Sequence, residues 1–312
     1  MNTNIKFNNL IELTKYFASE RKCAEHLAQL RWGDTPACVH CGSVKVYKCK
    51  AIKSYICGEK ECGKRFSVIT GTFFENTKLP LSKWFIAIYL CFSHKKGVSS
   101  CQLARDLSIT QKAAWHVLHR IRSLVAEKNP AMFQGIIEVD ETYVGGKAGN
   151  KHAKKRKELK AKGTGYINKT MVFGILEREG RIYTQVVANV FGNNLKPIIK
   201  DNVQEGSLVM TDGFGAYHGL NKDYQHEILN HHKGEYVRGK FHTNSIEGFW
   251  SQLKRGLYGI YHQVSPKHLH RYCNEFAFKY WTRKASEQQR FDIALLACSG
   301  NLSYKVLIAP KA

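Results

Sequence analysis

Two pairs of closely spaced cysteines constrain the first part of this chain more than any other feature. Cys38 and Cys41 form a C-x2-C pair, and Cys57 and Cys62 form a C-x4-C pair after a further 15 residues. A tetrahedral zinc ion needs four soft ligands, which two tight turns with short strands between them can supply. The sequence therefore predicts a zinc ribbon with one structural Zn²⁺, and Cys49 between the pairs is not expected to be a ligand. The alternative is four unrelated reduced thiols.

No targeting segment is visible, which bears on the state of these thiols. The first 17 residues lack an apolar core, and the longest apolar run, Trp84–Phe92, is nine residues, too short to span a bilayer. We therefore expect a cytoplasmic, nucleoid-associated protein whose cysteines are reduced. In such a compartment clustered cysteines indicate metal binding before disulfides.

The charge of the chain points to a polyanionic partner. Lys and Arg number 48 against 25 Asp and Glu, a net charge of +23 in a chain of 312 residues with an ordinary hydrophobic content of 43%. The excess is not confined to a tail, because residues 1–130 alone hold 21 basic and 9 acidic side chains. We expect double-stranded DNA to contact more than one domain.

Breaks in pattern divide the chain into five predicted parts. These are an N-terminal helix (1–32, with the helical period in 6–31), the zinc ribbon (33–78), a helix-turn-helix module (79–130), an α/β domain (135–285) and a C-terminal extension (286–312). The last part has no readable element.

The helix-turn-helix prediction comes from two apolar-periodic segments around a short turn. Residues 81–94 form a first helix with Ser82 as a candidate N-cap, and residues 99–106 and 110–124 follow, the latter capped by Thr110. The second helix of such a motif enters the major groove of DNA. Its candidate DNA contacts are Gln111, Lys112, His116 and Arg120. A small helical bundle without DNA-binding function is the alternative.

A dense basic segment follows the strand predicted at 136–144. Residues 147–162 hold eight Lys and Arg and a single acid. Two interpretations remain open. The segment is either a solvated loop or a clamp on the DNA backbone, with Lys154, Lys155 and Lys157 as contacts.

Three carboxylates, two of them associated with apolar strands, are candidates for binding a divalent cation. Asp140 lies in an apolar strand on the same face as Glu138, Asp212 ends the strand predicted at 207–211, and Glu247 opens a helix predicted at 243–258. Clustered carboxylates repel one another unless a cation lies between them, and oxygen ligands suit Mg²⁺ or Mn²⁺. Two such ions can promote phosphodiester chemistry. The alternative is a set of separate structural or surface acids.

The helix that carries Glu247 has two distinct faces. Lys254 is two turns beyond Glu247 and shares its face with Asn244, while Ile246, Trp250, Leu253 and Leu257 form an adjacent apolar stripe. One face therefore packs while the other presents polar groups. Lys254 and Arg255 are candidate DNA contacts, and His242, just before the helix, is a candidate phosphate contact.

Together these residues resemble the DDE triad of transposases and retroviral-type integrases. Asp140, Asp212 and Glu247 have 34 residues between the last two, and the strings FSVITGTFFE, EVDETYVGG, TDGFGAY and HTNSIEGFWSQLKRG are similar to the insertion-sequence family numbered fifteen-ninety-five over roughly residues 30–285. The resemblance implies an RNase H-like fold with a mixed five-stranded sheet and flanking helices. It also implies cleavage at transposon ends and joining of the 3′-hydroxyl to target DNA. The third position of the triad can be an Asn in this group, so Asn244 is the alternative to Glu247.

The resulting prediction is a multidomain DNA transposase. Its zinc ribbon and helix-turn-helix bind the terminal inverted repeats, and its α/β RNase H-like domain holds two Mg²⁺ or Mn²⁺ ions through Asp140, Asp212 and Glu247, with Lys254 near the scissile phosphate. A homo-oligomer is expected when two DNA ends are paired. The rival hypotheses are a nuclease that only hydrolyses DNA and a zinc-ribbon DNA-binding regulator with an inactive catalytic domain.

Overall fold

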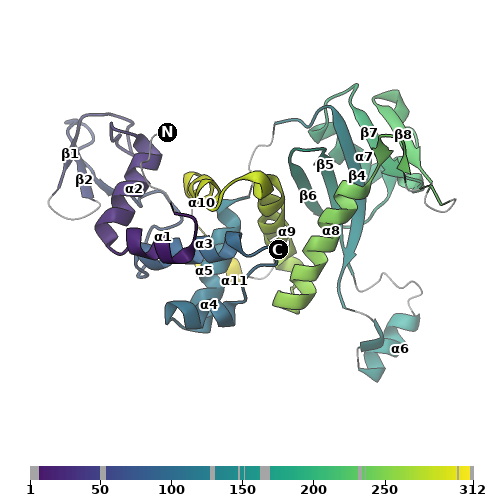
Figure 1. Cartoon of the computed structure of the whole chain (residues 1–312), viewed down its shortest axis with the longest axis horizontal. Helices are drawn as coiled ribbons and strands as arrows, with labels where there is room; N and C mark the ends of the chain where they lie inside the picture. The colour runs from purple at the N-terminus through teal and green to yellow at the C-terminus, as the bar shows by residue number, and fades with distance from the viewer. Residues whose placement is uncertain are drawn as a thin grey trace. The chain divides into compact units, whose positions relative to one another are not determined.

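The computed structural model divides into two compact units. It describes residues 7–49, 54–126, 131–146, 148–150, 152–161, 169–230, 234–235, 237–300 and 302–309. The first unit comprises Met1–Ala126 with Lys284–Ala312, and the second comprises Glu127–Arg283 (Figure 1). No described helix combines the length and apolar character needed to cross a membrane.

The first unit opens with two helices where the sequence predicted one. Helix α1 (Leu10–Tyr16) is capped by the Asn9 side chain, and α2 (Glu20–Trp32) is capped by Ser19, whose hydroxyl accepts from the Lys22 backbone N–H. Both residues satisfy orphan amides of a helix start. The single-helix prediction over 6–31 is therefore wrong, because Ser19 starts a new helix within it.

A small antiparallel sheet follows, as the cysteine pattern predicted. Its strands are β1 (Val46–Lys48), β2 (Ser54–Cys57) and β3 (Arg65–Ser67), in that order. Tyr55 and Phe66 stack with their ring centroids 5.5 Å apart and form a small core together with Cys38 and Cys57.

Three helices complete the N-terminal part of this unit. They are α3 (Leu81–Ser93), α4 (Ser100–Leu107) and α5 (Gln111–Leu124). Helix α3 has Pro80 as its N-cap, so the prediction of Ser82 in that role is wrong. Between α4 and α5 the chain turns at Ser108, which has a left-handed φ of 49°, and Thr110 caps α5 by accepting from Ala113 N–H. The predicted helix, short turn and helix are present.

The C-terminal segment returns to the first unit. It forms α10 (Glu287–Leu296), which begins with a capping box at Ser286 and Gln289, and α11 (Tyr304–Ile308). Buried His26 of α2 is 2.9 Å from Asp292 of α10, which ties the two ends of the chain together. No pattern in the sequence signals this pairing.

A mixed five-stranded sheet organises the second unit, as the resemblance implies. Its strand order is β6-β5-β4-β7-β8, with β4, β7 and β8 parallel and β5 antiparallel to both of its neighbours. The strand bounds are β4 (Ile136–Val144), β5 (Thr170–Glu177), β6 (Ile182–Val187), β7 (Leu208–Asp212) and β8 (Gln225–Leu229). The strands predicted at 136–144 and 207–211 are confirmed, the second one residue further along the chain.

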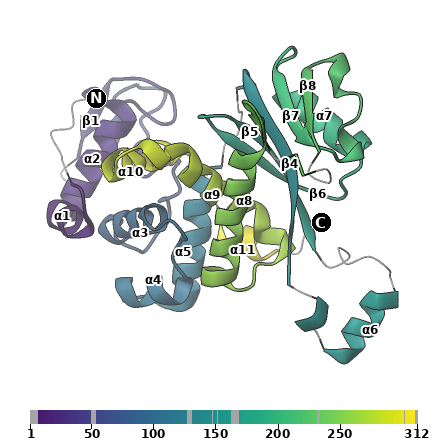
Figure 2. The same ribbon diagram turned by 45° about the vertical axis from the view of Figure 1, so that its right-hand side comes forward.

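Helices cover both faces of this sheet (Figure 2). Helix α7 (Gly192–Asn202) packs on one face through Leu195 and Ile199, against Val139 of β4 and Ile175 of β5. Helices α8 (Asn244–Gly256) and α9 (Pro266–Trp281) pack on the other face, against the β4, β5 and β6 residues Val144, Val172, Leu176 and Ile182. Since strand residues alternate between faces, Glu138 and Asp140 of β4 point toward α8.

Shorter elements connect these layers. The basic segment after β4 contains a 3-10 turn (Ala148–Asn150) and helix α6 (Ala153–Ala161), so its description as a loop is wrong over those residues. Strands β9 (Val237–Arg238) and β10 (Phe241–His242) pair with each other just before α8. Short 3-10 helices lie at Gly215–Tyr217, Leu220–Lys222 and Thr282–Lys284, and a π-helical turn, Leu257–Tyr261, directly follows α8.

Candidate active site and zinc centre

Two adjacent parallel strands bring Asp140 and Asp212 together. The register of β4 and β7 places Glu138 beside Met210, and the two aspartates stand two residues further along each strand. Buried apolar residues before each aspartate, Ile137 and Val139 in β4 and Val209 and Met210 in β7, fix its strand in the sheet. Asp212 also caps the turn that follows, since its Oδ1 accepts from Phe214 N–H at 3.0 Å.

The Asp140 carboxyl is held in an unfavourable electrostatic environment. Burial, together with the neighbouring charges of Glu141, Asp212 and Glu247, raises its pKa to about 8. A buried carboxylate beside other acids loses hydration and gains repulsion, so its charged form needs a partner. Such a partner is a cation or a hydrogen-bond donor, and the indole Nε1 of Trp250 donates to Asp140 Oδ2 at 3.0 Å.

Glu141 lies beside Asp140 in the chain but has a separate partner. The Tyr217 hydroxyl donates to Glu141 Oε2 at 2.6 Å. Burial raises the pKa of Glu141, and the charge of Asp212 adds to the shift. The charge of Asp212 therefore acts on two consecutive acids of β4, Asp140 and Glu141.

Helix α8 supplies the third predicted acid. Glu247 and Asn244 are both exposed in its first turn. Thr243 Oγ1 donates to Glu247 Oε1 at 2.9 Å. The charge of Glu247 raises the pKa of Asp140, as the charge of Asp212 does, so both predicted acids lie within electrostatic reach of Asp140.

The basic residues of α8 lie further along the helix. Burial lowers the pKa of Lys254, while the charge of Asp140 opposes that change, so the ammonium group lies within electrostatic reach of Asp140. Arg255 is exposed, and its Nη2 donates to Ser251 Oγ at 2.7 Å. Lys254 is therefore half-buried within electrostatic reach of Asp140, whereas Arg255 is exposed to solvent.

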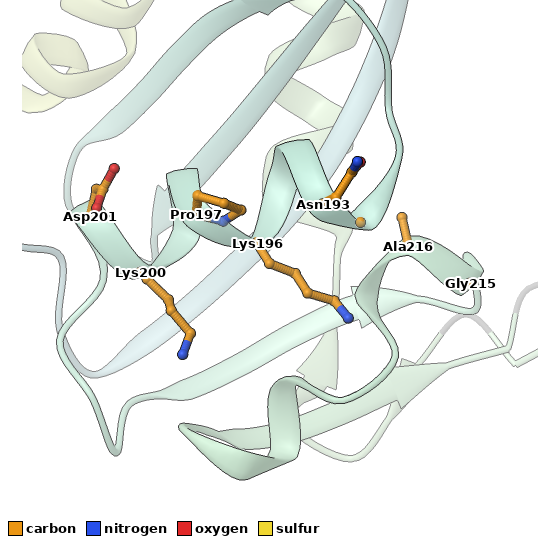
Figure 3. Close-up of a pocket in the computed structure, with 8 residues that line it drawn as sticks. Asn193, Lys196, Pro197, Lys200, Asp201, Gly215 and Ala216 are labelled. Carbon is orange, nitrogen blue, oxygen red and sulfur yellow. The ribbon is translucent and has the colours of Figure 1, made fainter.

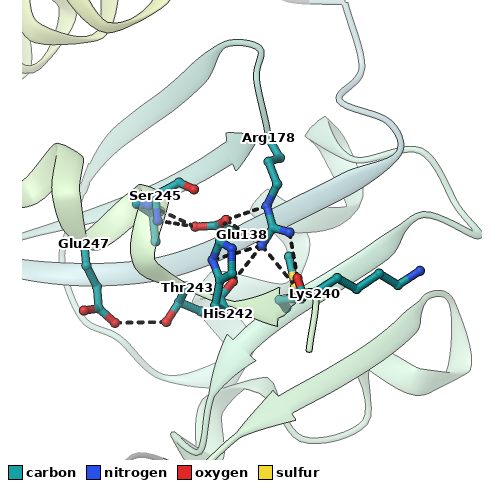
Figure 4. Close-up of polar contacts among 9 residues, drawn as sticks. Glu138, Arg178, Lys240, His242, Thr243, Ser245 and Glu247 are labelled. Atoms are coloured by element: carbon teal, nitrogen blue, oxygen red, sulfur yellow. Dashed lines mark hydrogen bonds and ion pairs between the residues drawn. The ribbon is translucent and has the colours of Figure 1, made fainter. Parts of the chain in front are cut away.

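Glu138 is engaged differently from the other acids (Figure 4). Its fully buried carboxylate accepts from the backbone N–H groups of Ser245 and Ile246 at 2.9 and 3.0 Å, and forms an ion pair with Arg178 at 2.9 Å. Arg178 also donates to the carbonyl oxygens of Lys240 and His242 at 2.8 and 3.0 Å. His242, predicted near the site, thus belongs to this polar cluster.

The donor set fits hard divalent cations. Asp140, Asp212 and Glu247 offer only oxygen, the ligand type that Mg²⁺ and Mn²⁺ prefer, and their mutual repulsion is what a bound cation relieves. Within the described residues they do not converge as closely as the cysteine cluster does.

The four predicted zinc ligands converge in the first unit. The Sγ atoms of Cys38, Cys41, Cys57 and Cys62 all lie within 4.8 Å of one another. Cys38 Sγ is 3.8 Å from Cys62 Sγ, and Cys41 Sγ is 3.5 Å from Cys57 Sγ. Sulfurs on a tetrahedral zinc with bonds of about 2.3 Å are about 3.8 Å apart, so the cluster has the size of a zinc site. Cys49 is not part of it.

The predicted DNA contacts of α5 divide into two groups. Gln111 and Lys112 are exposed at the start of the helix, where Gln111 donates to Ser100 Oγ and Lys112 lies 4.9 Å from the centre of the Tyr304 ring. His116 is half-buried, with Nε2 3.3 Å from the Leu302 carbonyl oxygen.

The prediction that Arg120 contacts DNA is wrong. Its side chain is only 6% exposed, donates to the Glu75 carbonyl oxygen at 3.2 Å and lies over the Trp84 ring. Its position next to the apolar stripe of α5 draws the long aliphatic stem into the core.

The basic segment presents its charge to solvent where it is described. Lys154 and Lys157 of α6 are exposed, whereas the side chain of Lys155 lies outside the described residues. A solvated face and a DNA clamp both remain compatible with this placement.

A surface pocket of about 590 Å³ lies beside the turn that follows Asp212 (Figure 3). Lys196 and Lys200 of α7 line it together with Asp201, Gly215 and Ala216. Asp223 pairs with Lys200 at 2.7 Å, so the positive charge of the pocket is largely balanced. Neither Asp140 nor Glu247 lines this pocket, and it is distinct from the acidic site.

Sequence reasoning missed two partners in the site. Arg178 follows β5 in a turn, and nothing in its local sequence signals that it reaches the start of α8. Trp250 was predicted to belong to the apolar stripe, and it does pack there, but its indole N–H also donates a hydrogen bond to Asp140. Glu138 did carry a signal, since it is an acid in mid-strand on the face of Asp140.

Comparisons with known proteins follow the same division of the chain. Residues 132–280 match the ISXO2-like transposase domain, and residues 18–65 match the transposase zinc-ribbon domain. The chain is 30% identical over 278 residues to an uncharacterized protein in transposable element ISH50 of Halobacterium salinarum, an alignment covering 85% of this chain and 92% of that protein.

Two further similarities are more limited. An uncharacterized transposase-like protein of Haemophilus influenzae is 31% identical over 101 residues, which cover 32% of this chain and 80% of that protein. The structure of the Mos1 strand transfer complex aligns with 10% identity and a TM-score of 0.30, over 70% of this chain and 79% of that chain.

Proposed function

Because this chain belongs to the ISXO2-like transposase family and carries the zinc ribbon of such transposases, we propose that it cuts DNA at the ends of an insertion sequence and joins the freed 3′-hydroxyl to target DNA. The observation that carries this proposal is the placement of Asp140, in the middle of β4, and Asp212, at the end of β7, side by side on neighbouring parallel strands, with α8 packed on the face of Asp140.

Asp140, Asp212 and Glu247 would hold two divalent ions. When bound, Mg²⁺ or Mn²⁺ supplies stabilisation of the charge that develops on the attacking and leaving oxygens of a phosphodiester. Trp250 orients the Asp140 carboxylate through its indole N–H. Lys254, whose ammonium is near Asp140, is positioned to contact the phosphate next to the cleaved bond.

DNA recognition is assigned to both units. Gln111 and Lys112, exposed at the N-terminus of α5, would reach base edges of the terminal repeat if α4 and α5 act as a helix-turn-helix. Lys154, Lys155, Lys157 and Arg255 would contact phosphates, which position the protein without reading sequence. Pairing of two element ends would require at least two copies of the chain.

A strand-transfer assay tests this function. Purified protein is incubated with labelled terminal-repeat DNA and a supercoiled plasmid in Mg²⁺, and the products are mapped to single nucleotides. We expect nicks at the repeat boundary and covalent joining of the 3′ end to plasmid. Nicking without joining would instead support the hydrolytic nuclease, and binding without nicking would support the regulator.

A further inference from the structure

The carboxylate of Glu138 lies two residues from Asp140 on the same face of β4, yet its contacts differ from those of a metal ligand. One oxygen accepts from two backbone amides of α8 and the other from Arg178, so both lone-pair-bearing oxygens are already occupied. Its side chain has no exposed surface, and the ion pair with Arg178 is 2.9 Å long.

Helix α8 lacks the usual local cap. Its N-cap residue, Thr243, makes no side-chain capping hydrogen bond and instead donates to Glu247. The amides of the first turn are orphan donors that need an acceptor, and a negative charge there is favoured by the helix dipole. Glu138 supplies both from the neighbouring strand.

Arg178 extends this connection to the segment before the helix. Its guanidinium donates to the carbonyl oxygens of Lys240 and His242, which immediately precede α8 (Figure 4). Glu138 and Arg178 therefore fix the start of α8 relative to the strand that carries Asp140.

We infer that Glu138, with Arg178, is a positioning residue that holds the first turn of α8, and hence Glu247 and Asn244, in place opposite Asp140 and Asp212. This inference rests on the proposed function for what the held residues do. Glu138 itself binds no metal ion. Its effect on divalent cations is exerted through the location of α8.

The Glu138→Gln variant tests this role with little change of shape. A Gln amide oxygen can accept from Ser245 and Ile246, but its NH₂ group then faces the N–H donors of Arg178. The variant can satisfy the helix or the arginine, not both. Arg178→Lys is a second, milder variant that keeps the positive charge but loses the planar fork that reaches several acceptors at once.

Glu275→Gln is the matched control. Glu275 is also fully buried in the second unit and is paired with buried Lys279, but both residues lie on α9, and Glu275 accepts from the Tyr261 hydroxyl beyond the end of α8, not at its start. Like Glu138→Gln, this variant loses a buried ion pair in the second unit. Any effect of general destabilisation should therefore appear in both variants. A purely structural role for Glu138 predicts equal behaviour of the two variants.

Two measurements separate the possibilities. Bound Mn²⁺ is counted by electron paramagnetic resonance in the absence of DNA, and hydrogen exchange is followed in peptides covering residues 243–250. For Glu138→Gln we expect about tenfold weaker Mn²⁺ binding with an unchanged number of ions at saturation. Mutating residues that hold metal ligands in place typically lowers metal affinity 10–100-fold. We also expect faster exchange in the first turn of α8. Arg178→Lys should show both effects in weaker form, and Glu275→Gln neither.

Wild-type Mn²⁺ affinity and exchange in Glu138→Gln would overturn the inference, as would a matching loss in Glu275→Gln. A lower number of bound ions in Glu138→Gln would also overturn it, because Glu138 would then be a ligand. Failure of the proposed function has a separate signature, the absence of any Mn²⁺ binding by the wild-type protein. In that event unchanged exchange in Glu138→Gln still refutes the positioning role, and faster exchange upholds it.

Discussion

Trp250 of α8 donates its indole hydrogen to Asp140 of β4, and this contact depends on the absence of a side chain at Gly174. Gly174 pairs with Asp140 across β4 and β5, and a Cβ there would lie 2.6 Å from Trp250 Cζ2 and 3.2 Å from Ile246 Cδ1. Helix α8 therefore packs over Gly174, where the missing side chain leaves space for the indole beside Asp140.

Gly174→Ala should displace α8 and destabilise the protein by about 1–3 kcal/mol, the usual cost of overpacking. Thermal unfolding monitored by circular dichroism measures this effect. Gly248→Ala in the same helix is the control, because a Cβ there meets nothing within 4 Å and alanine favours helix. Equal melting temperatures for the two variants would show that Trp250 does not need the space at Gly174.

The zinc ribbon predicts one tightly bound zinc ion per chain. Cys57→Ser should abolish zinc binding and unfold the ribbon, since a structural zinc supplies much of the folding free energy of such a small module. Metal analysis of the purified protein gives the stoichiometry. Cys101→Ser is the matched control, because Cys101 is exposed and lies outside the cluster, so that variant should retain its zinc. Retention of zinc in Cys57→Ser would refute the ligand assignment.

DNA binding should separate into sequence-specific and general contributions. Lys112→Ala should weaken the preference for terminal-repeat over random DNA. Neutralising Lys154, Lys155 and Lys157 together should weaken binding to both DNAs and reduce the salt dependence by up to about three units of slope, because each lysine that neutralises a phosphate accounts for about one unit. Fluorescence anisotropy across a salt series measures both quantities. If the triple variant lost only the preference for the repeat, the roles assigned to α5 and α6 would be reversed.

Arg120→Ala provides a further check on α5. Because the guanidinium is buried against Glu75 and Trp84, this change should lower the melting temperature. It should leave the salt slope of DNA binding unchanged, since a guanidinium in the core neutralises no phosphate. A lower salt slope of DNA binding with an unchanged melting temperature would instead show that Arg120 contacts a phosphate of DNA.

The pKa of Asp140 predicts how stability depends on pH without divalent ions. Its folded-state pKa of about 8 lies above the ordinary value of 3.8 for an aspartate, so the folded protein holds a proton that the unfolded chain has released between these pH values. Stability therefore falls as pH rises through this window, by up to about 1.4 kcal/mol per pH unit from this group.

Asp140→Asn removes this dependence. In buffer free of Mg²⁺ and Mn²⁺, the advantage of the variant in free energy of unfolding should grow from pH 5 to pH 8. Added Mg²⁺ should restore the free energy of unfolding of the wild-type protein at pH 8, because the cation takes the place of the proton on Asp140. It should not change the stability of the variant. If the free energy of unfolding of the two proteins changed with pH in the same way, the raised pKa of Asp140 would be contradicted.

Much of this site could be predicted from the sequence because its residues sit in strongly patterned elements. Asp140 and Asp212 interrupt or end apolar strands, and Glu247 opens a helix with one clear apolar stripe, so strand alternation and helical period place all three. The cysteine spacing likewise predicts the ribbon without any tertiary information.

The remainder depends on contacts that no local pattern encodes. Arg178 acts on α8 across 60 or more residues of chain, and His26 pairs with Asp292 across most of it. The burial of Arg120 depends on Trp84 from another helix. Long polar side chains next to an apolar stripe can turn either way, and only the neighbouring element decides which.

The most direct test of the account is cleavage and joining of labelled terminal-repeat DNA by four variants, with DNA binding measured in parallel. Asp140→Asn, Asp212→Asn and Glu247→Gln should abolish both reactions in Mg²⁺ and in Mn²⁺ while binding persists. Asn244→Ala should reduce the rate and leave detectable product, because a neutral amide contributes less to holding two cations than a carboxylate does. Normal cleavage by Glu247→Gln together with an inactive Asn244→Ala would make Asn244 the third ligand. Activity in either Asp variant would contradict the two-metal site itself.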